Sequence, residues 1–107
     1  MFGKHNAVGI IPMLPGITRQ TLVYGPQTLM TEFRLERDSV LPRHAHPHEQ
    51  TGYLVAGRLR LTIGDETRDL EPGDSWCIPG DVAHSAVALE ESVAVEVFAP
   101  VREDYLP

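Results

Sequence analysis

Between residues 20 and 100 the chain has no long stretch with the apolar spacing of an amphipathic helix. Short segments of alternating apolar and polar residues occur instead, as at Leu59, Leu61 and Ile63. Nine glycines and nine prolines separate these segments as turn residues. Such a chain buries its apolar side chains by packing or closing β-sheets, so we expect an all-β sandwich or barrel.

The expected strands include residues 29–35, 53–55, 59–63, 75–78 and 93–99. No linker, repeat or low-complexity segment divides the chain, which predicts one domain over residues 1–107 with its barrel at about 20–100. The first sixteen residues contain several glycines and prolines and read as an extended N-terminal arm, which could lie across a partner subunit. That arm and an exposed edge strand favour a homodimer.

The charge balance restricts the possible partners. The formal net charge is -6 and no basic stripe is present, which argues against binding to nucleic acid or to an anionic membrane. No apolar run reaches transmembrane length, no secretory leader is recognisable, and the single Cys77 excludes an internal disulfide. We therefore expect a cytoplasmic protein. A small anionic substrate stays compatible with the acidic chain, because one metal ion and one arginine can reverse the local field.

Three of the five histidines fall between His44 and His48. On a strand, positions 44 and 46 point to the same side, and Pro47 then forces a turn after which Gln50 can point back to the same space. His84 can close the site from another strand. This spacing predicts one divalent transition-metal ion, with Zn, Ni, Mn, Fe and Cu all open, held by His44, His46, Gln50 and His84.

The predicted donors are all neutral, so a bound dication would keep its full charge and act as a strong Lewis acid. This set differs from the two-histidine, one-carboxylate triad of non-haem oxygenases. The alternative is that these histidines are solvated loop residues beside a proline. Glu49 could replace Gln50 as the oxygen ligand, but as its neighbour it should face the other way. His48 lies in the turn and is expected to be outside the ligand set.

These two segments resemble the paired motifs of the cupin superfamily. The resemblance covers roughly residues 38 to 88 and reads His44-x-His46-x3-Gln50-x6-Gly57 and Gly73-x5-Pro79-x-Asp81-x2-His84. The chain departs from the family pattern at Asp38 and Asp81, where glycine is usual, and at Gln50, where many members have Glu. The resemblance implies a double-stranded β-helix, the cupin jelly-roll barrel.

The last strand presents two faces. Alternation places Val93, Val95 and Val97 on one side and Glu96 and Phe98 on the other. From the residues alone, the valines can face the core with Glu96 in water, or Glu96 and Phe98 can line a cavity. By the same alternation only one of Trp76 and Cys77 faces inward, where packing is the expected role.

This ending is similar to that of the small cupins of the KdgF type, in which an Asp, a Phe and an Arg act in the site. The resemblance implies catalytic roles for Glu96, Phe98 and Arg102, with Glu96 standing where the Asp is expected. It also implies a metal-dependent lyase or isomerase of small anionic sugars, which linearises 4,5-unsaturated uronates from pectin and alginate breakdown to 5-keto-4-deoxyuronates. The alternatives are a metal-dependent dioxygenase of a small organic acid and a non-catalytic cupin that binds a sugar or effector. Arg19 and Arg34 could enter the cavity, but nothing in the sequence places them.

Overall fold

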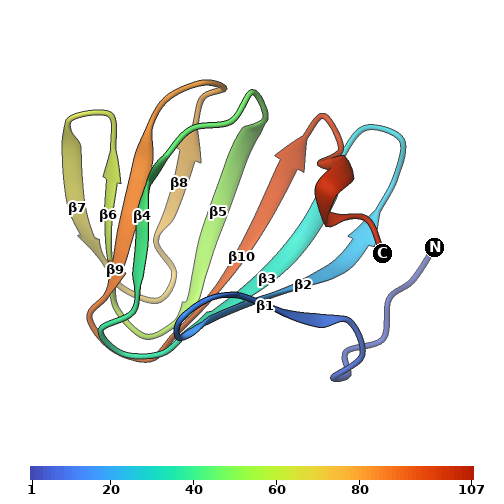
Figure 1. The fold of residues 1–107 in the computed structure, drawn as a ribbon, viewed down its shortest axis with the longest axis horizontal. Coiled ribbons are helices and arrows are strands. Elements are labelled where there is room, and N and C mark those ends of the chain that lie inside the picture. The colour runs from blue at the N-terminus through green and yellow to red at the C-terminus, as the bar shows by residue number, and fades with distance from the viewer.

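The computed structural model describes all 107 residues and contains ten strands and one short 3-10 helix (Figure 1). Their bounds are β1 Ile10–Leu14, β2 Ile17–Tyr24, β3 Leu29–Leu35, β4 Val40–His44, β5 Glu49–Ala56, β6 Leu59–Ile63, β7 Glu66–Leu70, β8 Ser75–Ile78, β9 His84–Ala88, β10 Ser92–Ala99 and η1 Glu103–Tyr105. No helix has the length and apolar character that crossing a bilayer requires.

The strands form two antiparallel sheets. One has six strands in the order β1-β2-β3-β10-β5-β8, and the other has four in the order β4-β9-β6-β7. Figure 1 shows the two sheets side by side, with η1 beside the end of β10. The prediction of an all-β jelly-roll barrel is therefore confirmed.

Period-two alternation produces this arrangement. In β3 every second side chain is buried, including those of Leu29, Phe33 and Leu35, whereas the alternate ones are more exposed. The inward faces of the other strands supply the rest of a 14-residue core cluster. Removing these apolar surfaces from water is the main force that holds the two sheets together.

The N-terminal stretch differs from the predicted arm. Residues 1–12 are exposed, but Ile10–Leu14 pairs with β2 of the same chain, with Ile10 opposite Gln20 and Pro12 opposite Thr18. Gly16, with a φ of 77°, lies in the hairpin turn between the two strands. The glycine and proline residues therefore mark a turn. Part of the expected arm is β1, an edge strand of the six-stranded sheet.

Two turns meet at one end of the barrel and set the relative positions of the histidines. The Asp81 N–H donates a hydrogen bond of 2.8 Å to the carbonyl of His46. Gly80 packs so closely there that a Cβ on it would lie 2.5 Å from the Pro47 carbonyl oxygen. Asp81 has a φ of 66°, in the left-handed region that Asp tolerates better than most residues. This packing brings the turn before His84 against the turn that carries His46.

Candidate metal centre and adjoining cavity

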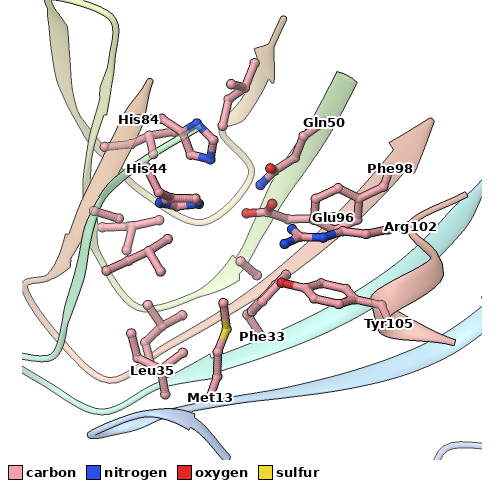
Figure 2. Close-up of a pocket in the computed structure, with 17 residues that line it drawn as sticks. Met13, Phe33, Leu35, His44, Gln50, His84, Glu96, Phe98, Arg102 and Tyr105 are labelled. Carbon is pink, nitrogen blue, oxygen red and sulfur yellow. The ribbon is translucent and has the colours of Figure 1, made fainter. Parts of the chain in front are cut away.

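Three imidazoles converge at the open end of the barrel. His44 on β4 and His84 on β9 are direct cross-strand neighbours, and His46 follows β4. A ligating nitrogen of each lies within 4.8 Å of those of the other two. In Figure 2, His44 and His84 lie on one side of a cavity and face Gln50 and Glu96 on the other. The structure thus brings together the three histidines that the spacing suggested.

Backbone carbonyls fix the tautomer of each imidazole. The Nδ1 of His44 lies 2.8 Å from the Pro42 carbonyl oxygen, and the Nδ1 of His84 lies 2.9 Å from that of Val82. The Nδ1 of His46 lies 3.1 Å from the carbonyl oxygen of His48. A carbonyl can only accept, so each Nδ1 carries the hydrogen when the ring is neutral. Each Nε2 is then left with a free lone pair, the arrangement typical of metal-ligating histidines.

The surroundings of these lone pairs fit a cation. The Nε2 of His46 lies 2.9 Å from the Oε1 of Gln50, so two acceptor atoms face each other. The Nε2 of His84 is buried with no hydrogen-bond partner. Two facing acceptors and a buried lone pair without a partner are both unfavourable. A positive ion shared by His44, His46, Gln50 and His84 would satisfy them.

Burial also sets the charge state of two of these imidazoles. It lowers the pKa of His84 to about 4, with the neighbouring His44, His46 and Arg102 lowering it further against the hydrogen bond to Val82. The pKa of His46 is likewise lowered, chiefly by burial. Both rings are therefore neutral at physiological pH, which is the state that binds a metal.

The cavity beside the histidines is largely apolar, and its few polar groups come from opposite sides. Glu96 and Phe98 face into it from β10, and Phe98 is 1% exposed. The valines that alternate with them lie on the other face of the strand, so β10 adopts the second of the two arrangements that the sequence allowed. Figure 2 shows the Glu96 carboxyl and the Arg102 guanidinium both directed toward the histidines.

Glu96 is a buried carboxyl. Burial raises its pKa to about 8, and the Trp76 indole and the Arg102 charge lower it in part. The indole nitrogen is close enough to act on the carboxyl but not in the geometry of a formed hydrogen bond, because Trp76 Nε1 and Glu96 Oε2 are both without a partner. Such a group exchanges a proton near neutral pH, as a general acid or base must.

The segment after β10 adds two side chains to the cavity. Arg102 is held by Asp104, whose two carboxylate oxygens lie 3.1 and 3.2 Å from Arg102 Nε. Its guanidinium lies 4.0 Å from the ring centroid of Tyr105, and that of Arg19 lies at the same distance. Because two cations cannot share one ring face at this distance, Tyr105 lies between them.

Sequence reasoning missed Tyr105, whose hydroxyl is buried without a partner and whose ring lines the cavity. Burial is the main cause that raises the pKa of this hydroxyl, which therefore keeps its proton. The signal available in the sequence was weak: an aromatic residue three positions beyond Arg102, in a tail with no strand pattern. Only the packing of η1 against the barrel reveals it.

The other residues considered from the sequence lie around this centre. His48 is half-buried behind His46 and outside the group of three. Glu49 is exposed and accepts from the Cys77 thiol on the outer face. Arg34 pairs with Glu32 away from the cavity. Arg19 reaches the site only through its contact with the Tyr105 ring.

Comparison with known proteins points to one family. The sequence profile of the cupin domain matches residues 31–99. The pectin degradation protein KdgF of Dickeya dadantii is 31% identical over 93 residues, which cover 85% of this chain and 84% of that protein. The solved structure of KdgF from Halomonas sp. matches with a TM-score of 0.91 at 32% identity, over 99% of this chain and 98% of the other. An RmlC-like cupin from Shewanella frigidimarina matches with a TM-score of 0.87 at 27% identity, over 96% of each chain.

Replacing a predicted ligand should remove metal binding. We expect His46→Ala and His84→Ala each to weaken the binding of Zn²⁺ or Ni²⁺ by more than about 100-fold, since even outer contacts of a metal site contribute 10- to 100-fold. Isothermal titration of the metal-free protein measures this. His5→Ala, which changes an exposed histidine of the N-terminal stretch, serves as the control. Wild-type affinity in both ligand variants would contradict the site.

The buried carboxyl should make the stability of the metal-free protein depend on pH. The folded protein keeps the Glu96 proton up to about pH 8, whereas the unfolded chain loses it near 4.5. The stability contributed by the protonated carboxyl is thus complete below 4.5 and is lost as the pH rises through about 8. Relative to Glu96→Gln, we expect the free energy of unfolding to fall by at most about 1.4 kcal/mol per pH unit across this window.

Urea unfolding of both metal-free proteins at several pH values from 5 to 8 measures this difference. His84 contributes in the opposite sense, because its lowered pKa stabilises the fold above 6.5 and that contribution is lost as the pH falls toward about 4. Both proteins contain His84, so its contribution cancels in the comparison. Parallel stability curves would contradict a buried, protonated Glu96.

Proposed function

This chain belongs to the cupin family, and from that premise we propose that it is a metal-dependent enzyme that linearises 4,5-unsaturated uronates to 5-keto-4-deoxyuronates. One observation carries the proposal: a buried carboxyl, an aromatic ring and an arginine enter the same cavity as His44 and His84, two of the three converging histidines. The similarity to the KdgF proteins, one of which is described as a pectin degradation protein, supports a uronate as the substrate class.

We assign the metal ligands to His44, His46, Gln50 and His84. A divalent ion held by these four neutral donors would supply Lewis acidity for an anionic substrate. The anchored imidazoles would orient it, and the apolar wall of the cavity would exclude bulk water from the reacting atoms.

Arg102 would bind the carboxylate of the substrate. Asp104 occupies its Nε, which leaves the terminal guanidinium nitrogens free for two parallel hydrogen bonds to a carboxylate. Tyr105 supports the guanidinium from one face, and Phe98 lies 5.2 Å from it. Phe98 also offers its ring to the apolar face of a sugar. These contacts would fix the position and orientation of the substrate in the cavity.

The chemical step needs one proton removed and one added. In its ionised form Glu96 would take the proton of the C1 hydroxyl, so that C1 becomes an aldehyde carbon as the C1–O5 bond breaks and its electron pair passes to O5. The resulting enolate would take a proton at C4 and become the 5-keto group. We assign that proton to the Tyr105 hydroxyl, which is buried and has no protein acceptor. Return of the Glu96 proton to Tyr105 through water completes an isomerisation with no net proton change.

The loss of ultraviolet absorbance of unsaturated galacturonate tests this function in the metal-loaded protein. We expect Glu96→Asp to retain activity, and Glu96→Ala and Tyr105→Phe each to lower kcat by about 10²- to 10⁴-fold, the usual contribution of a general acid or base. Glu91→Ala, which changes an exposed glutamate outside the cavity, is the control. If the wild type lost absorbance no faster than buffer alone, the proposal would be wrong. Oxygen uptake with a small organic acid would indicate a dioxygenase instead.

We also propose that the protein forms a homodimer through the outer face of the six-stranded sheet. Tyr53 and Val55 on β5 are 51% and 48% exposed, and Val95 lies opposite Tyr53 on β10. Such an apolar strip on a sheet is typical of an interface. Sedimentation at micromolar concentration should show a dimer for the wild type and a monomer for Val55→Glu. A monomeric wild type would rule the dimer out.

A further inference from the structure

A row of three residues crosses the six-stranded sheet beside the cavity. Glu96 on β10 is the register partner of Gly52 on β5, and Gly52 is the register partner of Trp76 on β8. Register partners on neighbouring strands project from the same face of a sheet, so all three positions face the interior. Gly52 and Trp76 are both buried. The middle position of the row has no side chain, which leaves a gap between the outer two.

The indole of Trp76 fills that gap. A Cβ built on Gly52 would lie 2.1 Å from Cε2, 2.2 Å from Nε1 and 2.3 Å from Cζ2 of Trp76. The nitrogen-bearing edge of the ring therefore lies directly over the main chain of Gly52. The backbone of Gly52 is not in the left-handed region, so its conformation does not require glycine. The close approach of the indole is what excludes any side chain there.

Beyond Gly52 the row continues to Glu96, and the Trp76 indole is close enough to that carboxyl to lower its pKa. Trp76 Nε1 and Glu96 Oε2 are a buried donor and a buried acceptor, and neither has another partner. An indole N–H can only donate, and a carboxyl keeps one accepting oxygen even when it is protonated, so the two atoms are complementary. Buried polar groups rarely stay unpaired in native proteins, and each of these two is the group that the other lacks.

We infer that Trp76 is a positioning residue for Glu96: a small adjustment of the geometry seen here lets its indole N–H donate across Gly52 to Oε2. The other carboxyl oxygen is then left to take the substrate proton. This inference rests on the base role of Glu96 in the proposed function. A carboxylate anchored at one oxygen keeps the geometry that proton transfer requires, and a displacement of about 1 Å can cost on the order of 100-fold in rate.

The contact itself can be tested without substrate or metal. Trp76 is the only tryptophan, so the protein gives a single indole N–H resonance in an ¹H–¹⁵N spectrum. We expect that resonance to move upfield and its hydrogen to exchange faster in Glu96→Ala, which removes the acceptor, and in Gly52→Ala, which displaces the ring. Gly25→Ala is the matched control, because nothing lies within 4 Å of a Cβ at that position. A resonance that is unchanged in both test variants would overturn the inference.

The positioning role needs a kinetic test in the metal-loaded protein. Trp76→Phe keeps an aromatic ring but removes the N–H, so we expect kcat to fall 10- to 100-fold while KM changes little. Gly52→Ala should reproduce this split by displacing the ring while residue 76 stays a tryptophan. A normal kcat in a folded Trp76→Phe protein would refute the role even where the wild type turns over uronates. A wild type without turnover, with a responsive indole resonance, would refute the proposed function and the catalytic role while leaving the contact in place.

Discussion

Hydrogen bonds from imidazole to backbone organise the whole site. Each of the three converging histidines is held at Nδ1 by a carbonyl two residues away in the chain. Such bonds set both the orientation of a ring and the nitrogen that keeps its lone pair. Because the carbonyls belong to the turns and strands that carry the histidines, the geometry is built into the backbone. The barrel therefore presents a prepared set of donors, and little reorganisation is needed when an ion enters.

The same burial acts in opposite directions on the two kinds of titratable group. It lowers the pKa of His84 and raises that of Glu96, because in each case the neutral form is favoured away from water. His46 and His84 are thereby kept neutral, the state that a metal requires, while the carboxyl keeps its proton. Positive charge in the site favours the ionised carboxyl, and Arg102 already exerts this influence.

Local patterns predicted the fold and the histidines well, because both depend on short-range spacing. The departures from the cupin motif have a structural explanation: Asp38 and Asp81 stand where glycine is usual, and their φ values are 70° and 66°. These aspartates therefore keep the backbone shape that the motif glycines serve. Alternation alone could not decide which face of β10 is buried, because both faces carry apolar residues and only sheet packing distinguishes them.

The roles of Trp76 and Tyr105 could not be predicted from the sequence for a related reason. The significance of Trp76 depends on register with Gly52 and Glu96, which are 24 and 20 positions away in the chain and come together only in the assembled sheet. Tyr105 depends on the docking of η1, which Thr21 secures by donating to the Tyr105 carbonyl. The N-terminal turn at Gly16 was visible as a glycine, but pairing of the preceding strand with its own chain was not.

The proposed site is built partly by the barrel and partly by the peptide after β10, and this arrangement has an evolutionary consequence. The proposed metal ligands lie on or beside β4, β5 and β9, whereas Arg102 and Tyr105 lie on a short peptide after β10 that is not paired with either sheet. On the proposed assignment, exchanging that peptide would change the residues that contact a substrate while leaving the metal ligands in place. A single scaffold could in this way be retargeted by editing fewer than a dozen codons, so relatives with the same histidines need not share a substrate.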